Sequence, residues 1–164
     1  MNDNYFRNIL WAGVIAVALA FNGTAHGMIR TLPVEDLVAE AEHIVLAQVY
    51  SVMVVGTDPA SKMITLRNEM KLIESLKGQW PARKSVILTT TRHEEHWIED
   101  NVELPPTGTK VVLFLRRYKD RLVPVNGIQG VWPLEGNKLL QMGTGKTLND
   151  IRTIVKSQKM LKHQ

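Results

Sequence analysis

An alternation of apolar and polar residues between positions 64 and 72, interrupted only at Asn68, is the feature that most constrains the fold. The two sets are Ile64, Leu66, Met70 and Leu72, which are apolar, and Thr65, Arg67, Glu69 and Lys71, which are polar. Because successive side chains of a β-strand point to opposite faces, this segment is predicted to be a strand with one buried and one solvated face. Such strands are typical of antiparallel sheets.

Several other segments have the apolar content and length of strands. The longest, 44–55, is rich in valine and apolar on both faces, which suits a strand that bends through a barrel or lies centrally in a sheet. Turn residues separate the strands, including the strong tight-turn pair Asn126-Gly127. The predicted strands are 44–55, 64–77, 85–91, 110–117, 121–125, 129–134 and 138–142.

Helices are predicted only near the two ends of the domain. A short helix follows Thr31, which is expected to cap it, and has acidic residues in its first turn. A second helix, 147–162, is amphipathic and is expected to begin with Thr147 as its N-cap. Its predicted apolar face comprises Leu148, Ile151, Ile154, Val155 and Leu161, and its basic face comprises Arg152, Lys156, Lys159 and Lys162.

The first 27 residues have the pattern of a cleavable secretory signal peptide. One arginine, Arg7, precedes an apolar run over 9–21, and small residues follow, so that cleavage is expected after Ala25 or Gly27. An uncleaved anchor is the alternative, although the run is shorter than the roughly 20 residues of a membrane span. No cysteine follows the run, so a lipid anchor is not expected. The predicted location is the periplasm or outside the cell.

Composition limits what the predicted domain, 28–164, can do. The chain contains no cysteine, which excludes disulfides, thiolate metal sites and cysteine nucleophiles. Its formal net charge of +4 is mildly basic and fits contact with an anionic polymer, or simply solubility. A domain of this length can bury a core unaided. That core is predicted to include Ile64, Leu66, Met70, Leu113 and Leu115.

These elements predict a mainly β fold, a small antiparallel barrel or sandwich. Four motifs add a resemblance: Leu37-Val38-x-x-Ala41-x-x-Ile44-Val45, Leu76-Lys77-Gly78, Gly108-x-x-Val111-x-x-Phe114-Leu115, and Asn126-Gly127 with Gly130. This pattern resembles exported bacterial domains of unknown function that are similar to the OB-like barrel of netrin and tissue-inhibitor-of-metalloproteinase domains. The resemblance implies an OB-like fold. The metal-binding N-terminal cysteine of the animal inhibitors is missing here, so their mechanism does not carry over.

One motif suggests nucleotide binding but fails closer inspection, and the sequence shows no catalytic motif. Gly143-Thr144-Gly145-Lys146-Thr147 looks like the end of a phosphate-binding loop, but Leu140 stands where such a loop needs its first glycine. No serine has the context of a nucleophile elbow, and no carboxylate pair is marked by its surroundings. Aromatic residues near arginines on the last predicted strands could bind a nucleic acid, but packing of these aromatic side chains in the core is the favoured explanation. We therefore expect no cofactor and no nucleotide.

The long polar loop 92–109 holds the best binding candidates. His93, His96 and Trp97 lie at its start, and Arg116 and Arg117 end a nearby predicted strand. The favoured hypothesis is a non-catalytic interaction domain that uses these five residues to bind a protein or an anionic envelope polymer. The alternative is a metal-binding protein or metal-assisted hydrolase, in which His93 and His96 share an ion with Glu99 or Asp100.

Overall fold

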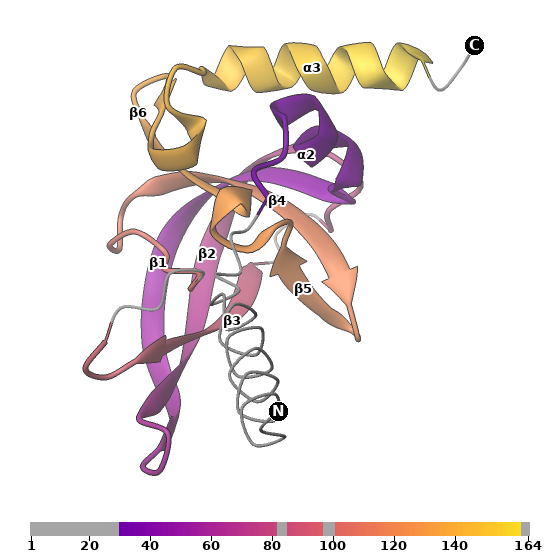
Figure 1. Ribbon diagram of the computed structural model, residues 1–164. Coiled ribbons are helices and arrows are strands. Elements are labelled where there is room, and N and C mark those ends of the chain that lie inside the picture. Colours follow the sequence, from indigo (N-terminus) through magenta and orange to yellow (C-terminus); the bar gives the residue numbers. More distant parts are fainter. Residues whose placement is uncertain (1–29, 82–84, 97–100, 162–164) are drawn as a thin grey trace, which may run out of the picture.

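The computed structural model describes residues 30–81, 85–96 and 101–161. The predicted signal peptide therefore lies outside the described residues. Every named strand belongs to one antiparallel seven-stranded sheet with the order β3-β2-β1-β4-β6-β7, and β5 pairs with β4 beside this path. The sheet is curved but does not close (Figure 1). The mainly β prediction is confirmed. Within the described chain no helix is both long and apolar enough to cross a membrane.

The strands follow the sequence prediction closely. Their bounds are β1 His43–Asp58, β2 Met63–Lys77, β3 Val86–His93, β4 Lys110–Tyr118, β5 Arg121–Pro124, β6 Val131–Glu135 and β7 Lys138–Leu139. Two predicted strands are shorter than expected, because a 3-10 helix takes Gly127–Gly130 and another takes Gln141–Gly143. Asn126-Gly127 does form a turn, with both residues at positive φ. It leads into the first 3-10 helix. This helix connects β5, which pairs with residues 115–118 of β4, to β6, which pairs with residues 110–113 of the same strand.

Both faces of the central strands β1 and β4 are buried. Ile44 and Phe114 face one core, and Val45 and Leu113 face the other. Helices α2 (Val34–Glu40) and α3 (Leu148–Leu161) cover the first core and lie on the same side of the sheet, α3 over α2 (Figure 1). The second core lies inside the curve of the sheet. This explains why β1 is apolar on both faces between Ile44 and Val49, the part of the strand that is buried.

Burial confirms part of the predicted core. Met70, Leu113 and Leu115 are fully buried, whereas Ile64 and Leu66 are only half-buried. The reason is that the β1–β2 hairpin reaches beyond the body of the domain, away from the helices (Figure 1). On this arm Val54, Val55 and the nearby Tyr50 are more than half exposed. The alternation in β2 therefore gave the correct face but not the depth of burial.

The first helix begins later than the sequence suggested, and Thr31 does not cap it. Pro33 occupies the N-cap position without a side-chain hydrogen bond. The preceding backbone is held extended by the buried amide of Gln129, which accepts from the Leu32 N–H at 2.9 Å and donates to the Leu32 carbonyl at 2.6 Å. This long-range pair fixes the chain until Pro33, and only then does the helix begin.

The C-terminal helix begins as predicted. Thr147 caps it, since its hydroxyl accepts from the Asp150 N–H at 3.2 Å and donates to the Asp150 carboxylate at 2.8 Å. The hydrogen bonds that the Thr147 hydroxyl and the Thr147 backbone N–H donate to the Asp150 carboxylate lower the pKa of Asp150 below its ordinary value. On the other hand, Leu161 is 72% exposed, so its place on the predicted apolar face is wrong: the sheet ends before the last helical turn. Arg152 ties the helix to β2 through Glu74, with a closest N–O distance of 2.6 Å.

Candidate functional site

The two histidines of the predicted binding loop lie together at the end of β3. Their rings stack, with centroids 4.8 Å apart and planes inclined by 17°. His93 is the last residue of the strand, and its Nδ1 accepts hydrogen bonds from the N–H groups of Glu95 and His96, each at 3.1 Å. The stack is therefore fixed by backbone hydrogen bonds to one ring. Trp97, the third loop candidate, lies outside the described residues.

A metal centre needs more ligands than this pair supplies. Structural and catalytic zinc sites use at least three protein ligands that converge on one point. Among residues 30–81, 85–96 and 101–161, no group of three histidine, aspartate or glutamate side chains is placed to hold an ion. Glu99 and Asp100, the ligands suggested by the sequence, lie outside these ranges. The described part of the structure therefore places no third ligand beside His93 and His96.

Arg116 and Arg117 do not act as a pair. As neighbours on β4, their side chains leave opposite faces of the sheet. The guanidinium of Arg116 lies 3.9 Å from the carboxylate of Glu40 on α2. Arg117, in contrast, lines a cleft on the far side, where β4 turns into β5. The structure therefore separates two residues that the sequence had grouped together.

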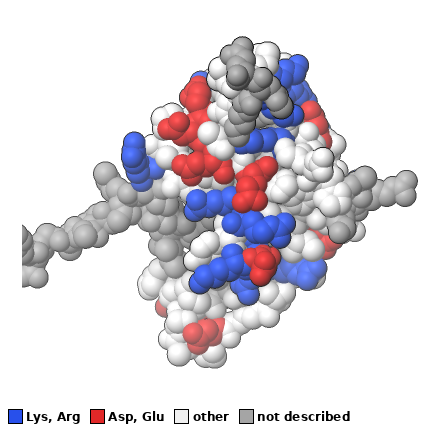
Figure 2. Space-filling model, turned by 90° about the vertical axis from the view of Figure 1, so that its right-hand side faces the viewer, with Lys and Arg blue, Asp and Glu red and all other residues white. Residues whose placement is uncertain are grey.

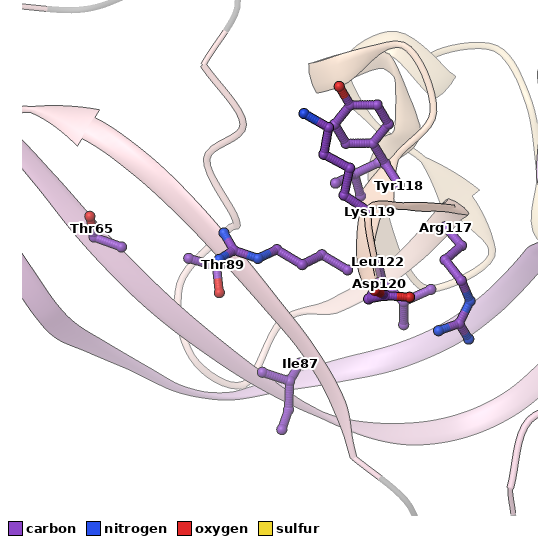
Figure 3. Close-up of a pocket in the computed structure, with 10 residues that line it drawn as sticks. Thr65, Ile87, Thr89, Arg117, Tyr118, Lys119, Asp120 and Leu122 are labelled. Carbon is purple, nitrogen blue, oxygen red and sulfur yellow. The ribbon is translucent and has the colours of Figure 1, made fainter.

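This cleft, which we call the seam cleft, has a volume of about 1000 Å³. One wall consists of Thr65, Ile87 and Thr89 from β2 and β3, and the other consists of residues 117–123 from the β4–β5 hairpin. Figure 3 shows the two walls facing each other across the gap. The cleft lies where β3 and β5 come close without pairing. Neither His93 nor His96 lines it.

The hairpin wall is rich in positive charge. Arg117, Lys119 and Arg121 face a single carboxylate, that of Asp120, and none of the three cations forms an ion pair within the described residues. Lys119 Nζ lies 5.4 Å from the centroid of the Tyr118 ring, a distance at which the ring attracts a cation. On the face of the molecule that carries β5, basic and acidic side chains lie mixed in a central band (Figure 2).

The tip of this hairpin has a strained backbone. Lys119 and Asp120 have φ of 45° and 62°, in the left-handed region required at both central positions of a type I′ turn. Asn-Gly, Asp-Gly and Gly-Gly are the favoured pairs there, because glycine has no Cβ and asparagine and aspartate tolerate the left-handed region. Lysine at the first position, and aspartate instead of glycine at the second, are therefore less favourable than Asn-Gly.

Replacing Lys119-Asp120 by Asn-Gly should therefore stabilise the fold. We expect the free energy of unfolding to rise by about 1 kcal/mol, because the strain at two left-handed positions is relieved. Urea denaturation of the double variant would measure the change. The net charge is unaltered, since one cation and one anion are removed together. A loss of stability would show that the native side chains stabilise the turn by contacts that outweigh the strain.

A smaller hollow of about 340 Å³ lies under the exposed β1–β2 arm. Val52, Val54, Leu66, Asn68, Arg92, Glu103 and Leu104 line it. Asn68 is buried, and its amide donates to the Leu88 carbonyl at 3.2 Å and to the Thr90 hydroxyl at 2.9 Å. These bonds account for its burial, so this polar residue stabilises the β2–β3 pair. The hollow itself offers one cation and one anion, without a net preference for charge.

Sequence reasoning missed most of the seam cleft. Of the four predicted binding residues that the structure describes, only Arg117 lines it. One signal was present, because residues 116–121 contain four basic side chains in six positions. The opposite wall gave no signal, since two threonines and one isoleucine are ordinary strand residues. Comparison with known proteins adds no assignment: no protein-family model matches the chain, and no similar curated protein was found.

Proposed function

We propose that this protein is a non-catalytic interaction domain that binds an anionic partner in the seam cleft. The observation that carries the proposal is the charge of the hairpin wall: three cations, one carboxylate, and no ion pair to neutralise the cations within the described residues. Unpaired cations in a cleft attract and orient an anionic ligand more strongly than cations scattered over an open surface. The partner is an acidic protein or an anionic envelope polymer.

The strained turn supports this proposal. A backbone strain of this kind persists only where the rest of the fold imposes it, and such strain is frequent at binding sites. Lys119 and Asp120 present charge at the rim of the cleft, where Asn-Gly would present none. The strain is explained if the charges serve binding and not stability.

The composition of the cleft agrees with binding and not with catalysis. Among the described residues, its lining includes one carboxylate, Asp120, whose side chain lies at an exposed turn, and no histidine. General acid–base catalysis usually depends on a pair of groups or on one buried group with a shifted pKa. We therefore propose a protein without enzymatic activity and without a cofactor.

Export from the cytoplasm is part of the proposal. The apolar run over 9–21 and the small residues after it support a cleaved signal peptide. The periplasm or the cell exterior would then supply the anionic partner. We also retain the resemblance to OB-like domains, which often bind extended ligands on an open side of the barrel. The loop with His93, His96 and Trp97 continues directly from β3, one wall of the cleft, and is proposed as a flanking contact.

The proposal predicts that charge in the cleft, and not overall charge, controls binding. The test uses fluorescein-labelled poly-L-glutamate and dextran sulfate as probes in an anisotropy titration. Arg121→Glu should weaken binding of the preferred probe by about tenfold or more, as expected for the loss of a close charge pair. Added salt should weaken binding further, because it screens exposed charges.

Lys156→Glu is the matched control. Lys156 is an exposed residue of α3, which lies on the helix-covered side of the sheet, and its substitution changes the net charge by the same amount. It should weaken binding no more than about twofold, the effect of general charge under screening. Equal losses in the two variants would mean that the protein attracts anions without a site, and the proposal would be wrong.

A further inference from the structure

The seam cleft opens over one face of β2 and β3, and not along a strand edge. Thr65 pairs with Thr91, and side chains two residues apart on a strand point to the same side. Thr65, Ile87 and Thr89 therefore share one face, while the other face of these strands lines the second core. Cα atoms of β3 and β5 lie within 8 Å of each other, which leaves no room for another strand between them. A ligand in the cleft thus meets side chains and not free backbone groups.

The strand wall of the cleft carries two free hydroxyl groups. Thr65 is half-buried and Thr89 is exposed. Within the part of the chain that the structure describes, neither hydroxyl forms a hydrogen bond with another group. Threonine is restricted in its χ1 rotation, so a paired strand holds each hydroxyl near a fixed position. Because a hydroxyl both donates and accepts hydrogen bonds, this wall suits a ligand that is itself rich in hydroxyl groups.

The hairpin wall places an aromatic ring beside a guanidinium group. Tyr118 and Arg121 are direct partners in the pairing of β4 with β5, so their side chains leave the same face of the hairpin. Tyr118 is 56% exposed, and Lys119 covers at most one face of its ring. In Figure 3 this ring lies across the gap from Thr65 and Thr89. The ring offers an apolar face, and the guanidinium can hold an acidic group through two parallel hydrogen bonds.

We propose that the seam cleft binds an acidic polysaccharide. Sugar units carry hydroxyl groups that Thr65 and Thr89 can bond, and flat C–H faces that pack on the ring of Tyr118. Their acidic groups pair with Arg121. An acidic polypeptide would use the cations alone, because the cleft offers no free strand edge for its backbone. This inference rests on the proposed function and specifies which class of anionic partner the cleft selects.

The test compares two fluorescein-labelled probes in an anisotropy titration, oligogalacturonate and oligo-L-glutamate with the same number of units. Each unit carries one carboxylate, so the two probes have the same charge. The sugar probe should bind the native protein at least about tenfold more tightly, because it alone uses the threonines and the tyrosine ring.

Removal of the two hydroxyl groups should act on one probe only. The double variant Thr65→Val with Thr89→Val should bind oligogalacturonate about tenfold more weakly, since two hydrogen bonds are lost, and oligo-L-glutamate less than about twofold more weakly. Valine favours strands as threonine does, so the fold is retained. Thr91→Val is the matched control. Thr91 is exposed on the same face of β3 but does not line the cleft, and its substitution should leave both affinities unchanged.

Tyr118→Leu tests the opposite wall independently. It should weaken binding of oligogalacturonate about fivefold, through loss of the ring, and binding of oligo-L-glutamate less than about twofold. Equal affinity of the native protein for the two probes would overturn the polysaccharide inference, and so would full affinity of the double threonine variant for the sugar. In both cases the proposed anion-binding function stands if Arg121→Glu still weakens binding. If Arg121→Glu weakens binding of neither probe, both proposals are wrong.

Discussion

Replacing Leu113 by alanine should lower the free energy of unfolding by about 2–5 kcal/mol. Leu113 has no exposed surface and lies in the middle of β4, where it pairs with Val45 on one side and Val131 on the other. Strands on both sides hold its position rigidly, so the surrounding core cannot collapse into the cavity that alanine leaves. The change would be measured by urea denaturation, with the slope of the transition as a check on two-state behaviour.

Leu161→Ala is the matched control for this prediction. The chemical change is the same, but Leu161 is 72% exposed at the end of α3. Its loss should change stability by less than about 0.5 kcal/mol, as surface substitutions usually do. If Leu113→Ala costs less than about 1 kcal/mol, the second core is not close-packed, and the burial of β4 on both faces would have to be reconsidered.

Substitution of Gly143 by alanine should cost about 1–3 kcal/mol through overpacking. A Cβ at this position would lie 2.8 Å from two ring atoms of Trp132 and 2.8 Å from the Cβ of Leu139, distances that real Cβ atoms essentially never show. Trp132 cannot easily move away, because it is 2% exposed and its ring packs on Phe114 at a centroid distance of 4.7 Å. A thermal melt with tryptophan fluorescence would report both the lost stability and the disturbed ring.

Gly145→Asn provides the comparison within the same loop. Gly145 has φ of +85°, but a Cβ there would meet nothing within 4 Å. Asparagine tolerates the left-handed region better than other side chains, so the cost should stay below about 1 kcal/mol. If the two variants lose the same stability, then loop flexibility and not contact with the Trp132 ring explains the effect at Gly143. In that case Gly143 and Gly145 would both be needed for the conformation of the backbone.

The sequence predicted the strands because local patterns determine which face of a strand is apolar. The alternation around Leu66 and Met70 gave the correct face of β2, and the apolar run at Val111–Leu115 gave the centre of β4. Depth of burial was predicted less well. Ile64 and Leu66 lie on an arm that extends past the body of the domain, and no local pattern records where neighbouring strands end.

Burial of single polar residues could not be predicted either. Asn68 occupies an apolar-facing position in the alternation, and its partners, the Leu88 carbonyl and the Thr90 hydroxyl, come from the next strand. Gln129 bonds to the backbone of Leu32, at the other end of the domain. A polar residue can be buried only if such partners exist, and the partners depend on the tertiary fold.

The candidate site was predicted only in part for the same reason. The basic residues at 116–121 are visible in the sequence, but alternation along β4 directs Arg116 to Glu40 and leaves Arg117 in the cleft. The opposite wall depends on how far the sheet curves, which brings Thr89 and Ile87 near β5. His93, predicted to lie in a loop, is the last residue of β3, and only His96 lies beyond the strand. Neither histidine lines the cleft, and the predicted anchor, Trp97, stays a prediction.

The position of β1 between β2 and β4 has a consequence for how the chain folds. β1 and β2 form a local hairpin that can close early, but the other edge of β1 must wait for β4, whose partner residues come much later in the sequence. Until then a strand without a single charged residue from Ile44 to Thr57 exposes both its apolar face and its unpaired edge. Segments of this composition self-associate readily. We therefore expect dilution or a holding chaperone during refolding to improve the yield of native protein.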